Sequence, residues 1–261
     1  MSDAPRGTAR RLAVVARAFD DDFRTAARLA REAGFAGLQL DPRLGELDLV
    51  LLSQSGRREL LSVFRANQLE LASLRMDLGA KGLGAGSDID ATLDRIEKLL
   101  TVAEALGRPI VCIELGPPPS DTSLLELARR ADRHGVVLAL RGELVSYADL
   151  EKAAKAGDCP WFGVDFDPVA ALRDEWPTDE IFSRVGQLIR HVRARDAILG
   201  SEKRTKPVTI GSGAVDWRKL MGDLEGVGFR GWVTIDSMEL QQRRAGAVSG
   251  AAAIRAIGPG F

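Results

Sequence analysis

The chain has 261 residues, a length at which single α/β barrels are common, and its 36 Lys and Arg nearly balance 37 Asp and Glu. The formal net charge of −1 excludes a whole-protein basic field, so we expect neither nucleic acid nor a membrane as a partner. Two cysteines are too few for a disulfide framework. The N-terminal sequence MSDAPRGTARR lacks the apolar core of a signal peptide, and we expect a cytoplasmic protein.

Short apolar runs alternate with helix-like segments after a loose N-terminal arm, residues 1–10. In the first half of the chain, strands are predicted at Leu12–Val15, Gly37–Asp41, Leu69–Arg75 and Pro109–Leu115. Apolar residues at helical spacing predict helices over 20–32, 57–66, 88–106 and 123–133.

The second half repeats the same alternation. Strands are predicted at Val136–Arg141, Trp161–Pro168, Ile189–Asp196 and Gly231–Asp236. Helices are predicted over 146–156, 168–172, 180–188, 216–225 and 246–257, with a polar loop over 200–213.

Eight strand-then-helix units of about thirty residues each are typical of a closed parallel (β/α)8 TIM barrel, here a single domain over residues 1–261. An open doubly wound sheet is the alternative. It is less favoured because the chain has no linker and no G-x-G-x-x-G after the first strand. The glycine-rich stretch Gly79–Ser87 lacks the lysine-hydroxyl pair of a P-loop, and we interpret it as an active-site loop.

Charged residues lie at the end of nearly every predicted strand. In a barrel of this type the chemistry takes place at the mouth formed by the carboxyl ends of the strands. Asp165 and Asp167 share one face of their strand, as do Arg193 and Arg195, so these charges are expected to converge in a lumen where unpaired ions are costly. The other strand-end charges are Arg17, Asp41, Arg75, Asp77, Glu114, Arg141, Glu143, Asp196 and Asp236.

Several segments resemble the xylose isomerase-like TIM barrel superfamily, the sugar phosphate isomerase/epimerase family, which also includes the type IV apurinic endonucleases. The resemblance spans nearly the whole chain and is specific in order and spacing. It rests on GFAGLQL, ALGRPIVCIELG, VDFDP, HVRARDA, IGSGAVDW and GFRGWVTID.

This resemblance implies a divalent metal, such as Mn²⁺ or Mg²⁺, bound by a Glu, an Asp, a His and a Glu at the ends of strands five to eight. The four positions hold Arg141, Asp167, Arg193 and Asp236, so only Asp167 matches outright. The His that often follows the Asp three residues later is Ala170. A guanidinium has only donors and stays protonated, so it cannot ligate a cation. We therefore expect no metal, with Arg141 and Arg193 bridging Asp167 and Asp236 instead.

The resemblance and these residues together predict an isomerase or epimerase that moves a proton next to the carbonyl of a sugar or sugar acid. Asp236 is the expected base, with Glu114 or Glu143 as its partner. Arginine would stabilise the oxyanion in place of the metal. The expected binding residues for a carbohydrate or other anionic ligand are Arg141, Asp167, Arg193, Arg17 and Arg75. Arg17 and Arg75 could instead pair with Glu114, Asp41 or Asp77.

The alternative is a non-catalytic barrel that binds an anionic small molecule or a protein partner. A DNA-repair endonuclease is disfavoured because two histidines cannot build its multi-zinc site. Of these histidines, we expect a core role for His191 and a C-terminal helix position for His134. A homodimer is possible, with Trp176 and Trp217 as interface candidates, although core packing is the default for both.

Overall fold

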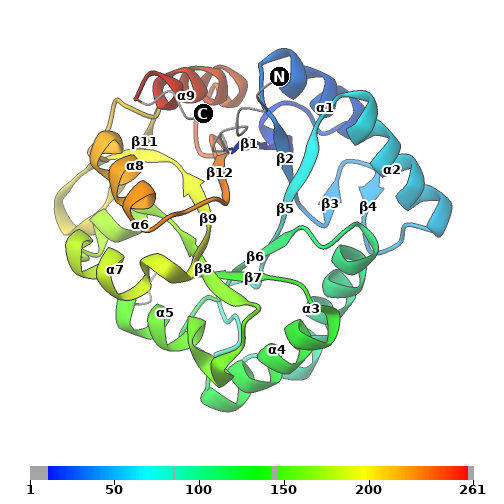
Figure 1. The fold of residues 1–261 in the computed structure, drawn as a ribbon, viewed down its shortest axis with the longest axis horizontal. Coiled ribbons are helices and arrows are strands. Elements are labelled where there is room, and N and C mark those ends of the chain that lie inside the picture. The colour runs from blue at the N-terminus through cyan, green and yellow to red at the C-terminus, as the bar shows by residue number, and fades with distance from the viewer. Residues whose placement is uncertain (1–10, 85, 143–145, 258–261) are drawn as a thin grey trace, which may run out of the picture.

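The computed structural model describes residues 11–84, 86–142 and 146–257. The chain folds into a closed barrel of eight parallel strands surrounded by helices (Figure 1). The strand order is β1-β12-β9-β8-β7-β6-β5-β2, and β1 pairs with both β12 and β2 to close the barrel. The predicted (β/α)8 TIM barrel is thus confirmed. The strands are β1 (Arg11–Val15), β2 (Gly37–Leu40), β5 (Glu70–Asp77), β6 (Ile110–Glu114), β7 (Leu138–Arg141), β8 (Phe162–Phe166), β9 (Ile189–Ala194) and β12 (Trp232–Ile235).

The outer helices begin at residues that the sequence marks as caps. Asp22, Ser53, Asp88, Ser120 and Asp216 each accept a hydrogen bond from a backbone N–H of the helix that follows. The helices are α1 (Phe23–Glu32), α2 (Gln54–Ala66), α3 (Ile89–Ala105), α4 (Asp121–His134), α5 (Tyr147–Ala154), α6 (Pro168–Arg173), α7 (Thr178–Val185), α8 (Trp217–Gly226) and α9 (Arg243–Ile257).

Two antiparallel hairpins were not predicted. The first pairs β3 (Arg43–Leu44) with β4 (Leu47–Asp48), after β2. The second pairs β10 (Asp196–Leu199) with β11 (Thr205–Val208), so the prediction of an irregular loop over 200–213 is wrong in part. β3 and β4 have two residues each, too few for alternation to be recognised in the sequence. β11 contains Pro207, a residue that argues against a strand.

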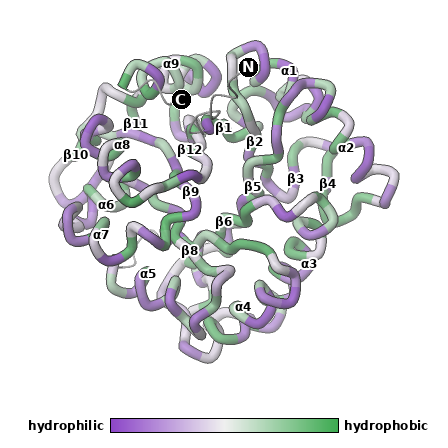
Figure 2. The backbone as a smooth tube through the Cα atoms, viewed as in Figure 1, coloured by the Kyte–Doolittle hydropathy of each residue, from purple (hydrophilic) through white to green (hydrophobic). Residues whose placement is uncertain are grey.

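The barrel interior changes from apolar to charged along its axis. Outward-facing strand residues pack against the helices, in which hydrophobic and hydrophilic residues alternate (Figure 2). Inside, Ala13, Ala72 and Trp232 form a small apolar cluster, and Trp232 pairs in register with the buried His191. Further along β9, toward the mouth, lies Arg193. This layering confines the charges to the mouth.

Asp196 fastens the segment before α8 to the end of β9. Its carboxylate is buried and accepts hydrogen bonds from the backbone N–H groups of Gly211 (2.9 Å), Gly213 (3.2 Å) and Val215 (3.2 Å). It also accepts one from Trp217 Nε1 at 3.1 Å. Asp196 therefore has a structural role, and Trp217 is a core residue.

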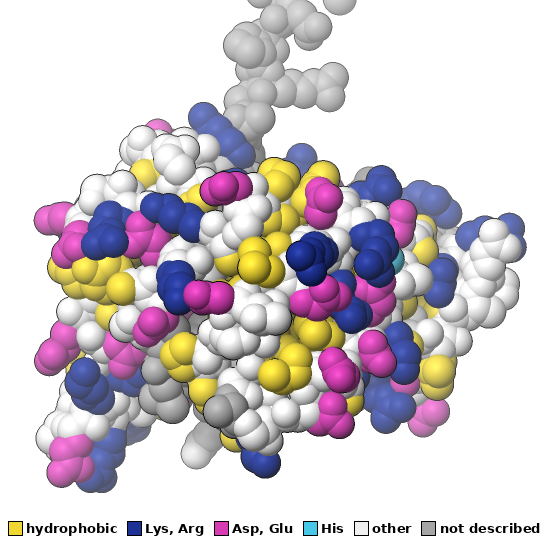
Figure 3. Space-filling view, turned by 90° about the horizontal axis from the view of Figure 1, so that it is seen from below, with side chains coloured by type: hydrophobic (Ala, Val, Ile, Leu, Met, Phe, Trp, Pro, Cys, Tyr) yellow, Lys and Arg dark blue, Asp and Glu magenta, His cyan; other side chains and the backbone are white. Residues whose placement is uncertain are grey.

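The surface agrees with the balanced composition. Acidic and basic side chains are interspersed on the face shown in Figure 3. Within the described parts of the chain, no helix is both long and apolar enough to cross a membrane.

Gly213→Ala tests the anchor at Asp196. A Cβ at Gly213 would lie 2.1 Å from Asp196 Oδ1 and 2.6 Å from the Ala197 carbonyl oxygen, so the segment must shift. We expect the free energy of unfolding, measured in urea, to fall by about 1–3 kcal/mol. Gly222→Ala is the matched control, because its Cβ meets nothing within 4 Å on the exposed face of α8. Equal stabilities of the two variants would contradict the anchor.

Candidate functional site

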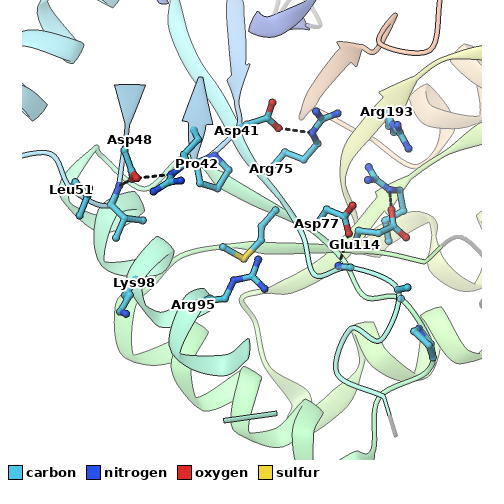
Figure 4. A pocket seen from close by; sticks show the side chains of 18 of the residues that line it. Asp41, Pro42, Asp48, Leu51, Arg75, Asp77, Arg95, Lys98, Glu114 and Arg193 are labelled. Carbon is cyan, nitrogen blue, oxygen red and sulfur yellow. Dashed lines mark hydrogen bonds and ion pairs between the residues drawn. The ribbon is translucent and has the colours of Figure 1, made fainter. Parts of the chain in front are cut away.

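A cavity of about 1160 Å³ opens at the barrel mouth, where β5, β6 and β7 end (Figure 4). Its wall also includes the β3–β4 hairpin and one side of α3. The charged side chains that line the cavity are Asp41, Arg43, Asp48, Arg75, Asp77, Arg95, Lys98, Glu114, Arg141 and Arg193.

Three of these side chains lie in one register row across neighbouring strands. Asp77 on β5 pairs in register with Glu114 on β6, which pairs with Arg141 on β7. Arg141 donates from Nε to Glu114 and from Nη1 to Asp165, at 2.9 Å. Burial alone would lower the pKa of Arg141, but Asp165 and Glu114 outweigh it and raise that pKa. The row therefore presents two carboxylates beside a permanent cation.

Asp236, at the end of β12, is enclosed by two arginines. Its Oδ2 accepts hydrogen bonds from Arg193 Nε at 2.8 Å and Arg75 Nη1 at 3.0 Å. Its Oδ1 accepts one from the backbone N–H of Met238 at 3.0 Å. Burial alone would raise the pKa of Asp236, but the two guanidiniums reverse this and hold the pKa well below the ordinary aspartate value. Asp236 is therefore kept ionised, and it does not line the cavity.

Asp167 has two structural tasks. Its Oδ1 caps α6 by accepting from the backbone N–H groups of Val169 (3.0 Å) and Ala170 (3.2 Å). Its Oδ2 accepts hydrogen bonds from Arg195 Nε at 2.7 Å and Arg193 Nη1 at 3.4 Å. Burial opposes ionisation, yet Arg195 and Arg193 lower the pKa of Asp167. Both oxygens are thus occupied.

The expected bridging by arginine is half right. Arg193 bridges Asp167 and Asp236, as expected. Arg141 does not, because its register beside Glu114 directs the guanidinium to Glu114 and to Asp165 on β8. The prediction that Arg141 binds Asp167 and Asp236 is therefore wrong.

Arg17 and Arg75 each form ion pairs with acidic side chains. Both donate to Asp41, from Nε of Arg17 at 3.3 Å and from Nε of Arg75 at 2.9 Å. Arg17 also binds Asp21 at 3.0 Å. The alternative in which these arginines pair with nearby acids is the one observed. Glu143, the other candidate partner base, lies outside the described residues, as does the N-terminal arm.

His191 lies in a buried polar layer below the mouth. Its Nδ1 donates to Asp165 Oδ1 at 2.6 Å, and its Nε2 shares a hydrogen bond with the Thr234 hydroxyl at 2.7 Å. Ser73 Oγ lies 3.3 Å from the same nitrogen. His191 has no exposed surface, which agrees with the expected core role. His134 ends α4 and pairs with Glu97 and Glu104 of α3, also as expected for a helix terminus.

The residues at the four expected ligand positions do not fit a divalent cation. Asp167 and Asp236 have both oxygens engaged by arginines or backbone N–H groups, and the other two positions are guanidiniums. Another possible donor group combines Cys112, Asp165 and His191. It fits no better, because both ring nitrogens of His191 are engaged and burial raises the pKa of the Cys112 thiol well above its ordinary value.

Three residues of the site, Arg195, Arg95 and Lys98, received no role from the sequence. Arg195 pairs with Asp167 and with Glu239, at 2.8 Å, on the segment after β12. Arg195 lies two residues after Arg193, on the same face of the strand, and this spacing is the sequence signal for its placement. Arg95 and Lys98 line the cavity from α3, and their three-residue spacing off the apolar face is the only sequence signal for them.

Comparison with known proteins agrees with the fold. Among solved structures, a xylose isomerase domain protein from Planctomyces limnophilus is 15% identical, with a TM-score of 0.75 and coverage of 94% of this chain and 95% of that one. A xylose isomerase-like TIM barrel protein from Mycobacterium smegmatis in complex with magnesium is 15% identical, with a TM-score of 0.74 and coverage of 96% of each chain. The 3-keto-D-glucoside 4-epimerase from E. coli is 18% identical, with a TM-score of 0.72 and coverage of 95% and 99%.

No curated protein sequence matches the chain. The family model for the xylose isomerase-like TIM barrel matches residues 27–257. That match covers almost the whole barrel, from α1 to α9. The chain therefore belongs to the xylose isomerase-like TIM barrel family.

Proposed function

We propose that this barrel is a sugar isomerase or epimerase that transfers a proton next to a carbonyl without a divalent metal ion. The observation that carries the proposal is the row of Asp77, Glu114 and Arg141 at the wall of the mouth cavity. Fold similarity to a 3-keto-D-glucoside 4-epimerase also supports it. A metal-free site is proposed because guanidiniums stand where the family would place two of its ligands.

In this proposal Arg141 binds the carbonyl oxygen of the substrate and stabilises the negative charge that develops on it. Arg141 is suited to this because its pairs with Glu114 and Asp165 hold the guanidinium in place before the substrate binds. Arg193 lines the same cavity and is fixed by Asp167 and Asp236. Preorganised cations of this kind need no rearrangement during the reaction.

Glu114 is the proposed base that takes the proton from the carbon next to the carbonyl. It is better placed than Asp236, which lies behind Arg75 and Arg193 and does not reach the cavity wall. Asp77 is the proposed second acid. Within the described chain its carboxylate accepts only the Gly79 backbone N–H, at 2.7 Å, and has no cationic partner. Asp236 then serves as a positioning residue for the two arginines.

A second candidate function is binding without catalysis. It is favoured by the locking of Asp167 and Asp236, because both acids are committed to arginines and neither lines the cavity. Such a barrel would hold an anionic small molecule, or a protein partner, with the same guanidiniums. The two functions differ in whether a carbon-bound proton is exchanged.

Solvent deuterium exchange tests the proposed chemistry. Chelator-treated protein is incubated in D2O with ketoses, aldoses, sugar acids and their phosphates, and deuterium on carbon is measured by mass spectrometry. We expect exchange that added Mn²⁺ does not increase, and a loss of about 100-fold or more in Glu114→Gln. Glu59→Gln, on the exposed face of α2, is the control and keeps full activity. No exchange with any substrate, or exchange only with added metal, would contradict the proposal.

Asp236→Asn tests the positioning role. Removing this carboxylate takes one acidic partner from the buried Arg193 and from the partly buried Arg75, and we expect a loss of about 3–5 kcal/mol in the free energy of unfolding at pH 7. Asp179→Asn, which removes an exposed pair with Lys219, leaves stability nearly unchanged.

The pH dependence has a definite sign. The pKa of Asp236 is lower in the folded chain than in the unfolded one, so its contribution is fully present above the ordinary aspartate pKa of about 3.9. The contribution is lost as the pH falls below that value. Urea unfolding should therefore show a large difference between wild type and Asp236→Asn at pH 6–7 that shrinks below about pH 4. A difference independent of pH would refute this account.

A further inference from the structure

Two cations on one face of α3 line the outer part of the mouth cavity. Arg95 and Lys98 are three residues apart, so their side chains are neighbours on the helix surface. Figure 4 shows Arg95 extending from α3 toward the cavity. Both residues are exposed, and neither forms an ion pair with another residue that the structure describes. Their charges are thus available to a ligand.

Three acids of α3, namely Asp94, Glu97 and Glu104, form their ion pairs with residues of α4 and not with these cations. Asp94, four residues before Lys98, lies 3.7 Å from Arg130 Nη1. Glu97 binds Arg133 at 3.0 Å and also contacts Arg130 at 3.4 Å. The helix is therefore divided into an acidic side that holds α4 and a basic side that lines the cavity.

The cavity wall carries a positive excess although the whole chain has a net charge of −1. Six cationic and four acidic side chains line it, for a formal charge of +2. Arg43 is paired with Asp48 at 2.7 Å, and Arg75 with Asp41 at 2.9 Å. Arg141 and Arg193 are paired as described above. Arg95 and Lys98 of α3 are the lining cations that form no described ion pair, and Asp77 is the lining acid that forms none.

We propose that Arg95 and Lys98 form a subsite for a terminal oxyanion, a phosphate or a carboxylate, of a sugar whose reactive carbonyl lies at Glu114 and Arg141. The assignment of the reactive end rests on the proposed function; the anion subsite does not. A cavity of about 1160 Å³ is large enough for both ends of such a ligand, since small-molecule sites commonly span roughly 300–1,000 Å³.

The chemistry of the pair suits an oxyanion. A guanidinium fork gives two parallel hydrogen bonds to oxygens of one phosphate or carboxylate, and an ammonium adds a compact charge beside it. Leu51 and Met76 line the wall as well and offer apolar contact to a carbon skeleton. The subsite would thus select anionic sugars over the neutral parent sugars.

Calorimetric titration tests the subsite. The probes are fructose 6-phosphate and ribulose 5-phosphate, the unphosphorylated sugars, gluconate, and inorganic phosphate. We expect wild type to bind at least one anionic sugar about tenfold or more tightly than its neutral counterpart. The phosphate and gluconate arms identify which oxyanion is preferred. In the double variant Arg95→Gln, Lys98→Gln, the ratio of the dissociation constant of the neutral sugar to that of the anionic sugar should fall close to one.

Arg58→Gln is the matched control, an exposed arginine of α2 that is also without a described ion pair and lies away from the cavity wall. It should retain the wild-type preference. The subsite is overturned if the double variant keeps the preference, if Arg58→Gln loses it equally, or if wild type binds no anionic probe better than the neutral sugar. Glu114→Gln should still bind the anions, so failure of the proposed catalysis and failure of the subsite remain distinguishable.

Discussion

The pairing of arginines with carboxylates inside the barrel mouth is the interaction on which the site depends. Placing a charge in a buried lumen is costly unless it is paired and hydrogen-bonded. Arg193 satisfies this requirement by binding Asp167 and Asp236, and Arg141 by binding Glu114 and Asp165. Because each pair joins two or more strands, the network also fixes how the strand ends meet. A change at one member is therefore expected to disturb the others.

The same network is the basis for the proposal that this family member works without a metal ion. Guanidiniums place fixed positive charge at two of the expected ligand positions. Arginines engage Oδ2 of Asp167 and of Asp236, and backbone N–H groups engage Oδ1 of each. The proposed catalysis therefore uses the acids that line the cavity, not the enclosed ones. Glu114 and Asp77 lie there, in register with Arg141. In this proposal the buried acids Asp167 and Asp236 position the arginines, and the acids that line the cavity, Glu114 and Asp77, transfer protons.

The sequence was sufficient for the fold because apolar runs and capped helices alternate eight times, and each strand of the barrel follows from its own residues. The family resemblance led to the expectation that Arg193 lies between Asp167 and Asp236, whereas alternation along the strand indicated only that Arg193 and Arg195 share one face. The sequence did not place Arg141, whose partner depends on the register between β6 and β7. Nor did it indicate Arg95 and Lys98 as part of the cavity wall, because that depends on how α3 packs against the barrel.

The replacement of metal by arginine is the central claim, and elemental analysis of protein purified without chelator from manganese- and magnesium-supplemented cells tests it most directly. The account predicts well below one Mn, Mg or Zn ion per chain, with no difference between wild type and Asp167→Asn. A content close to one ion per chain that is lost in Asp167→Asn or Asp236→Asn would contradict it.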